Sequence, residues 1–124
     1  MCFRVDPNYP DVLTATEDIQ CFKELYSDLS SLYKHFRYKL GETYELGESL
    51  KPDQLPNTDF WSIDRGFHSY CSDMTGREWM ATDSVYIWAE FCIPQGSKYY
   101  VNHERNEYVS NSIKFGSYTK MELV

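Results

Sequence analysis

The alternation of apolar and polar residues is clearest from Val85 to Phe115, where it predicts strands separated by turns. Val85–Ile93 has apolar residues at its odd positions and mostly large amphipathic ones between them, which is typical of a strand covered on both faces. Pro94–Ser97 follows, and its proline and glycine favour a tight turn. We therefore expect a hairpin from Val85 to Val101, and a further strand over Tyr108–Phe115.

Shorter segments earlier in the chain have the same β pattern. Their residues are β-branched, aromatic or regularly alternating, which suits a pleated surface with one face buried. Gly41 interrupts the pattern, and either a bulge or a tight hairpin at Gly41–Glu42 would account for the break. The strands expected here are Ile19–Leu25, Phe36–Leu40, Thr43–Leu46, Trp61–Ile63 and Gly66–Tyr70.

One segment favours a helix. Ser72 or Asp73 can cap a short helix that continues through Ala81, with Trp79 and Met80 facing inward. The predicted fold class is therefore α+β, mainly antiparallel sheet with C-terminal hairpins and one short helix near residues 73–81.

The chain length indicates one domain, because 124 residues can bury a core of ordinary size. Residues 1–18 contain Pro7 and Pro10 and several turn formers, so we expect an extended N-terminal arm. Residues 19–115 form the expected globular body, and residues 116–124 a C-terminal tail. Residues 47–59 lack periodicity and predict a surface loop.

Composition narrows the classes of partner. The net charge of −7 disfavours binding to nucleic acid, which depends on lysine and arginine neutralising phosphates. The chain has 11 tyrosines, and tyrosine supplies large contact area in protein interfaces. A protein partner is therefore expected, with the oligomeric state left open.

The cysteines do not indicate a metal site. They lie far apart, and no histidine stands at the spacing that zinc ligation needs. There is no leader-like segment and no apolar run of membrane-spanning length, so we expect no membrane insertion and a cytoplasmic protein with reduced thiols. The four cysteines are Cys2, Cys21, Cys71 and Cys92.

Three motifs carry a first resemblance: Gly66–Tyr70 (GFHSY), Cys92–Tyr100 (CIPQGSKYY) and Tyr108–Phe115 (YVSNSIKF). Over Ile19–Phe115 the chain resembles a loose group of small proteins from bacteriophages and gut bacteria that have no assigned function. The resemblance implies a phage or prophage origin and no particular activity.

A second resemblance concerns chemistry. The order of a cation on a first strand, serines on a later strand and a glutamate before a late strand is similar to the Arg, Ser-x-Ser and Glu pattern of ADP-ribosyltransferases. It implies an NAD site in which Lys23 replaces the arginine, Ser69 and Ser72 supply the serines, and Glu107 is the catalytic acid. The lysine cannot hold a diphosphate in the bidentate way of arginine, and the serines are three residues apart instead of two.

His68 has two interpretations. Beside Ser69 and Tyr70 it could carry protons near neutral pH, whereas a half-buried histidine bonded to a carbonyl would be structural.

Two function classes follow. The first is a small non-enzymatic protein-interaction domain, phage-encoded, that binds a host protein through a tyrosine-rich surface (Tyr99, Tyr100 and Tyr108) and acidic loops, without a cofactor. The alternative is a transferase acting on a nucleotide or NAD, with His68 and Glu107 in a sheet cleft.

Overall fold

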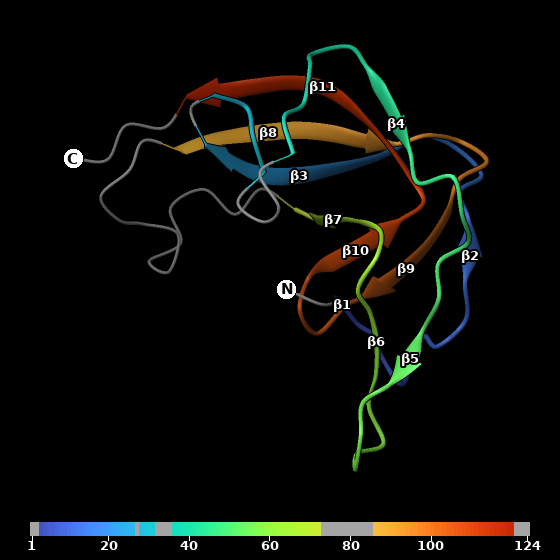
Figure 1. Ribbon diagram of the computed structural model, residues 1–124. Helices are drawn as coiled ribbons and strands as arrows, with labels where there is room; N and C mark the ends of the chain where they lie inside the picture. Colours follow the sequence, from blue (N-terminus) through green and yellow to red (C-terminus); the bar gives the residue numbers. More distant parts are fainter. Residues whose placement is uncertain (1–2, 27, 32–35, 73–85, 121–124) are drawn as a thin grey trace.

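The computed structural model describes residues 3–26, 28–31, 36–72 and 86–120, and throughout them the regular structure is β (Figure 1). No helix occurs in these residues, so the predicted α+β class is wrong and the described fold is all-β. The helix expected near residues 73–81 falls outside the described residues. The elements are β1 Phe3–Arg4, β2 Leu13–Thr14, β3 Ile19–Tyr26, β4 Thr43–Glu45, β5 Asp53–Gln54, β6 Trp61–Ile63, β7 Phe67–Tyr70, β8 Tyr86–Ile93, β9 Lys98–Asn102, β10 Glu107–Ser110 and β11 Ser112–Lys120.

Eight strands form one antiparallel sheet in the order β2-β9-β10-β7-β3-β8-β11-β4. β3 and β8 pair along their full lengths, from Ile19↔Ile93 to Tyr26↔Tyr86, which confirms both predicted strands. β7 meets β3 only at Phe22↔Tyr70. This narrow seam divides the sheet into two halves that lie at an angle to each other (Figure 1).

The inner face of this sheet holds the larger core, which we call the inner core. Cys21, Leu25 and Phe91 are fully or almost fully buried there, and Phe91 stacks on Phe115 with 4.6 Å between ring centroids. Period-two alternation along β3 and β8 brings the apolar residues to one face. The buried residues of the inner core are Ala15, Cys21, Leu25, Tyr38, Ala89, Phe91, Ile93, Ile113 and Phe115.

The turn Pro94–Ser97 forms, but the hairpin expected around it does not. The Ser97 amide donates to the Pro94 carbonyl at 3.0 Å, and Gly96 has a φ of 89°. β8 has β3 and β11 on its two sides, whereas β9 pairs with β10 and β2. The turn therefore carries the chain from one half of the sheet to the other. A hairpin between β9 and β10 does form, with Val109 opposite Tyr100.

A second antiparallel sheet, in the order β1-β6-β5, packs on the outer face. Phe3 and Ile63 face each other in register and are both fully buried. Gly66 lets the chain pass between the two sheets, because a Cβ at that position would come within 2.6 Å of Val109 Cγ2. The resulting outer core consists of Phe3, Val5, Leu50, Ile63, Tyr100 and Val109.

The segments at both ends of the expected body pack against it. Of the N-terminal segment, residues 3–18 are described, and Phe3 lies in the outer core and Ala15 in the inner core. Residues 116–120 continue β11 beside β8 after a bulge between Phe115 and Ser117.

The expected strand Phe36–Leu40 is absent. Arg37 makes only an isolated bridge with Ser30, and Tyr38 turns into the inner core. The other short strands form, but β6 and β7 belong to different sheets, so the chain at Asp64–Arg65 is a crossing between layers.

Candidate functional site

The residues of the transferase hypothesis lie on both faces of the sheet. The pairing Phe22↔Tyr70 directs Lys23 and Ser69 to the inner face, because side chains alternate along each strand. Glu107 is opposite Tyr70 and His68 is opposite Val109, so both belong to the outer face. The backbone of the sheet separates the two pairs, and no common cleft contains them.

His68 is held by the backbone. Its ring Nε2 donates to the Asp64 carbonyl at 3.2 Å. Burial lowers its pKa to about 4, and the positive charge of Lys23 lowers it further, against the raising effect of the Asp64 carbonyl. The imidazole is therefore neutral near physiological pH, as expected of a structural histidine.

Glu107 and Ser72 lie at neighbouring ends of β10 and β7. Glu107 begins β10, and partial burial raises its pKa while Arg105 lowers it. Ser72 is exposed beyond the end of β7, where its hydroxyl accepts a hydrogen bond from the Asn106 amide. A raised carboxylate pKa is common in catalytic acids, but Lys23 and Ser69 lie on the other face of the sheet from Glu107.

The three tyrosines do not form one exposed patch. Tyr100 lies in the outer core and is 7% exposed. Tyr99 and Tyr108 lie on the opposite face of the sheet from Tyr100 and pack against the inner core. Their rings form a T-shaped pair with 5.8 Å between the ring centroids. A contact surface made of all three would require both cores to open.

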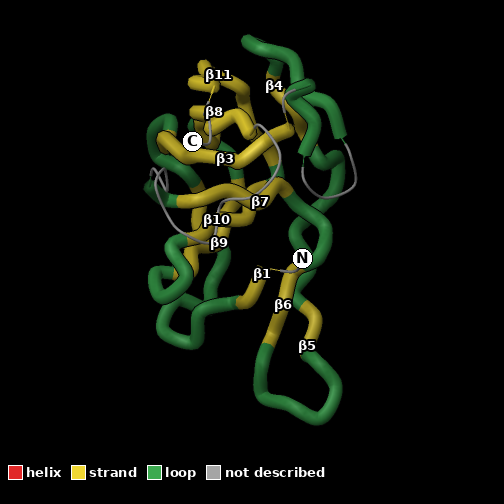
Figure 2. The backbone as a smooth tube through the Cα atoms, turned by 90° about the vertical axis from the view of Figure 1, so that its left-hand side faces the viewer, coloured by secondary structure: helices red, strands yellow, loops and turns green. Residues whose placement is uncertain are grey.

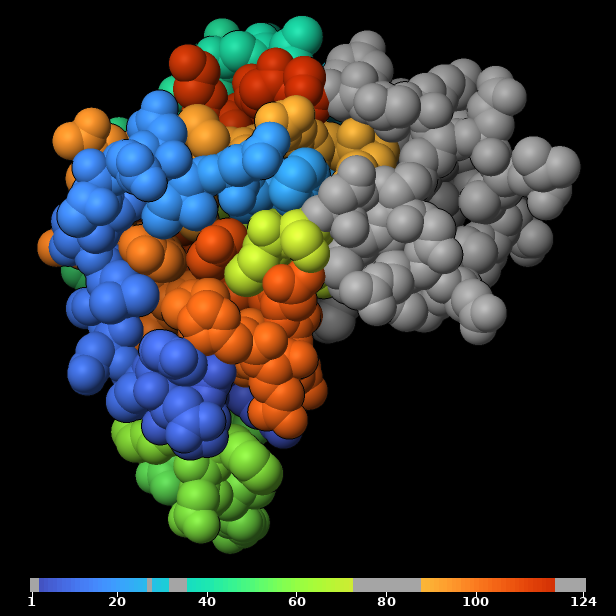
Figure 3. Space-filling view, turned by 180° about the vertical axis from the view of Figure 1, so that it is seen from behind, coloured from blue at the N-terminus to red at the C-terminus, as the bar shows by residue number. Residues whose placement is uncertain are grey.

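Among the described residues, the most exposed neighbouring aromatic pair lies elsewhere, on what we call the projecting hairpin, Asp53–Ile63. This hairpin comprises β5, β6 and their connecting loop, and it extends beyond the body of the protein (Figures 1 and 2). Phe60 is 46% exposed and Trp61 is 45% exposed. The view from behind shows the same segment protruding below the N-terminal residues (Figure 3).

The two aromatic side chains point to opposite faces of the hairpin. Trp61 shares a face with Ile63, so it continues the apolar face of the outer core past the point where the large sheet covers it. Phe60 lies on the other face, where the Arg4 guanidinium stands 4.4 Å from its ring centroid. Both faces of the hairpin therefore present apolar area to solvent.

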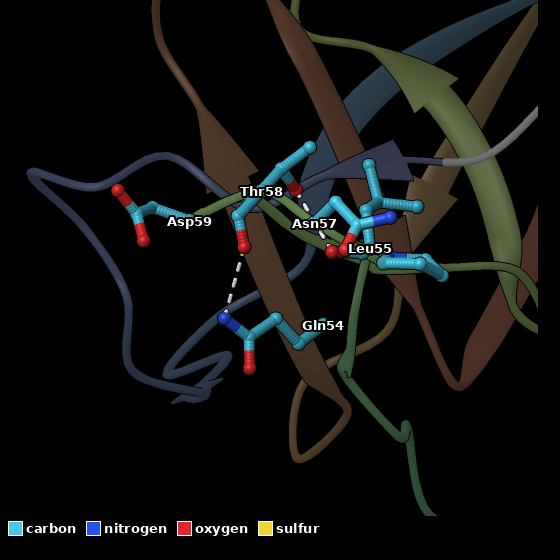
Figure 4. A pocket seen from close by; sticks show the side chains of 6 residues that line it. Gln54, Leu55, Asn57, Thr58 and Asp59 are labelled. Atoms are coloured by element: carbon cyan, nitrogen blue, oxygen red, sulfur yellow. Dashed lines mark hydrogen bonds between the residues drawn. The ribbon is translucent and has the colours of Figure 1, made fainter.

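Hydrogen bonds fix the loop at the tip of the hairpin. Thr58 Oγ1 donates to the Leu55 carbonyl at 2.9 Å and accepts from the Phe60 amide at 3.2 Å. Gln54 Nε2 donates to the Thr58 carbonyl at 3.0 Å, and Figure 4 shows these groups around a shallow hollow of about 380 Å³. Asn57 has a φ of 61°, a conformation that asparagine tolerates better than most residues. The tip is thus a preformed loop.

A larger hollow, of about 730 Å³, lies where β4, β9 and the turn 94–97 meet. Two of its ionisable groups have partners within the protein: Glu48 pairs with Arg65 at 3.0 Å, and Lys98 Nζ donates to Thr14 Oγ1 at 2.5 Å. Glu45 is exposed at its rim. The hollow has no unsatisfied polar group, among the residues described, that would identify a ligand.

Two kinds of feature do not occur in the described residues, a metal-ligand cluster and a membrane-spanning helix. No group of three or more histidine, cysteine, aspartate or glutamate side chains gathers there in a way that could hold a metal ion. Cys21, Cys71 and Cys92 are free thiols. None of the described segments forms a helix long and apolar enough to cross a membrane.

Comparison with known proteins adds no assignment. No protein-family model, no curated protein and no solved structure matches this chain. The function therefore has to be argued from the geometry.

The sequence analysis missed Phe60 and Trp61. The available signal was their adjacency: in an extended segment, neighbouring side chains point to opposite faces, so one of two consecutive large aromatic residues must leave the core. The loop Gly47–Asp59 was predicted, but not that it includes a strand and supports an aromatic tip.

Proposed function

We propose that this protein is a small non-enzymatic binding protein that contacts a protein partner through the projecting hairpin. The observation that carries the proposal is the exposure of Phe60 and Trp61 on a hydrogen-bonded loop that extends from the body. Aromatic side chains dominate the energetics of protein interfaces, and a preformed loop loses little conformational entropy on binding.

The charge of the hairpin indicates the kind of partner. Asp53 and Asp59 are exposed beside the aromatic residues, and Arg4 is engaged with the Phe60 ring. The chain as a whole carries a net charge of −7. A partner with an apolar pocket bordered by lysine or arginine fits this surface, because complementary charge speeds encounter and selects orientation.

The setting of this function is part of the same proposal. We infer a cytoplasmic, phage-encoded protein that acts on a host protein, on the basis of the sequence resemblance and the free thiols at Cys21, Cys71 and Cys92. The transferase alternative receives no support, since Lys23 and Ser69 lie on one face of the sheet and Glu107 on the other.

The test compares two double variants. Phe60→Ser/Trp61→Ser removes the aromatic tip, and Val12→Ser/Leu13→Ser removes an adjacent exposed apolar pair at the edge of the large sheet, where the exposures are 48% and 38%. Each immobilised protein is incubated with host lysate, and captured proteins are quantified by mass spectrometry. We expect one partner to be lost from the first variant and kept by the second.

A photocrosslinking residue at position 61 gives the second readout. It should form a covalent adduct with the same partner, and a crosslinker at Leu40, which is 54% exposed on the body, should not. Undiminished capture by the Phe60→Ser/Trp61→Ser variant would refute the proposal, as would an adduct at position 40 alone.

A further inference from the structure

The inner face of the large sheet contains a cation without a counter-ion. Lys23 lies between Cys21 and Leu25 on β3 and shares their face, so its side chain is directed at the inner core. Its Nζ donates to the His68 carbonyl and stands 5.8 Å from the centroid of the Tyr38 ring. Among the described residues, no carboxylate forms an ion pair with Lys23.

A second unsatisfied group lies across the seam. Ser69 is 4% exposed, and its hydroxyl has no hydrogen-bond partner within the described part of the chain. The pairing Phe22↔Tyr70 places Ser69 on β7 next to Lys23 on β3. The Ser69 hydroxyl is near the Cys21 thiol and lowers the pKa of that thiol, but a thiol is only a weak hydrogen-bonding group.

We propose that Lys23 and Ser69 bind a small monovalent anion, of halide size, inside the inner face of the sheet. An ammonium group has three donors, of which the His68 carbonyl uses one, and the serine hydroxyl supplies another. An anion accepts hydrogen bonds from both and neutralises the charge of a half-buried ammonium group that has lost part of its hydration.

The groups around Lys23 do not carry a compensating charge near neutral pH. Burial raises the pKa of Cys21 to about 12 and that of Cys71 to about 11, and it raises the pKa values of Tyr38 and Tyr108 as well. His68, on the outer face, is neutral because burial lowers its pKa to about 4. Lys23 is therefore the charged group that an anion would meet.

Binding is coupled to protonation of Lys23. Burial lowers the pKa of Lys23 to about 8, with a smaller raising effect from Cys21. Below this pH the amine is cationic and binds the anion; above it, affinity should fall about tenfold for each pH unit. A bound anion should in turn raise the pKa of Lys23.

The experiment measures thermal unfolding of the full chain in sodium bromide and in sodium gluconate at equal ionic strength. Near neutral pH, we expect the midpoint of thermal unfolding to be several degrees higher in bromide than in gluconate. At a pH well above the pKa of Lys23, the difference should be smaller. Lys23→Met and Ser69→Ala should each remove or reduce the bromide effect, and the exposed control Lys98→Met should keep it.

A bromide titration followed by the NMR signal of the Lys23 side chain gives a readout independent of stability. Saturable shifts at Lys23, absent from Lys98, are expected. Equal midpoints in the two salts, with no saturable shift at Lys23, would show that a neutral water or no ligand occupies the position and would overturn the proposal. Ser69→Ala removes only an unpartnered hydroxyl, so it should fold and keep the test decisive if Lys23→Met does not.

Discussion

The projecting hairpin and the inner face around Lys23 distribute polarity in opposite ways. The hairpin exposes Phe60 and Trp61 to water, whereas the inner face holds the half-buried Lys23 and the buried hydroxyl of Ser69 next to apolar side chains. Taken by itself, each arrangement lowers the free energy of unfolding. Exposed aromatics leave apolar area in water, and a buried cation loses its hydration.

The comparison shows where function should be sought in an all-β protein of this kind. Elsewhere, most of the buried apolar residues of the described strands belong to one of the two cores. Departures from local consistency tend to mark functional or strained sites. The hairpin is unusual because it exposes aromatic side chains, which suits a macromolecular partner. The inner face is unusual because it encloses polar groups, which suits a small ligand.

The largest effect is expected at the root of the hairpin. Ile63 and Trp61 share one face of β6, but Ile63 is fully buried and Trp61 is 45% exposed. Ile63→Ala should lower the free energy of unfolding by about 3 kcal/mol, through lost burial and a cavity beside Phe3, whereas Trp61→Ala should lower it by less than about 1 kcal/mol. Urea denaturation measures both. Comparable losses would mean that Trp61 belongs to the outer core and is unsuited to a contact role.

The contrast between these two regions also explains how much the sequence could predict. Alternation identified β3 and β8 because each spans eight residues with buried apolar positions, long enough for the period to be unambiguous. The same signal failed at Phe36–Leu40, where Tyr38 enters the inner core without a neighbouring strand to extend the ladder. Local pattern reports which residues are buried, but not which strands pair.

Pairing is the part that depends on distant residues. The turn Pro94–Ser97 was correctly located, yet β8 lies between β3 and β11, so β9 could not pair with it. The relative placement of the candidate site residues could not be predicted for a related reason: Lys23, Ser69 and Glu107 come from three strands whose faces depend on register. A shift of one residue exchanges the two faces of a strand, and sequence spacing does not fix that register.

A smaller effect is expected in the pH dependence of stability, through His68, whose carbonyl accepts a hydrogen bond from Lys23. The folded state keeps His68 neutral down to about pH 4, while the same histidine in the unfolded chain titrates with its ordinary pKa of 6.5. The unfolded state therefore binds more protons between these values, and stability should fall as pH decreases through this window. Because His68 is half-buried, we expect a loss of about 2 kcal/mol, less than full burial would give.

His68→Gln isolates this contribution. Burial raises the pKa of Glu24 and Glu107. Through these two carboxyls a lower pH stabilises the folded state, which opposes the effect of His68. The difference in unfolding free energy between wild type and variant, measured across the window, removes their effect. Parallel pH profiles would show that His68 has the same pKa in the folded and unfolded states, so that the folded protein accepts a second positive charge beside Lys23 as readily as water does.

The smallest effect concerns the tip of the hairpin and tests whether its shape is fixed before binding. Thr58→Val removes the hydroxyl that bridges the Leu55 carbonyl and the Phe60 amide. These groups are exposed and can bond to water instead, so global stability should fall by only about 0.5 kcal/mol. Hydrogen exchange at the Phe60 amide should nevertheless become faster, and partner capture should weaken because the loop must then be ordered on binding. Thr58→Ser, which keeps the hydroxyl, is the matched control. If Thr58→Val speeds exchange without weakening capture, Phe60 and Trp61 bind the partner from a flexible loop. The hydrogen bonds of the tip then contribute nothing to binding, and the two aromatic side chains alone distinguish the hairpin.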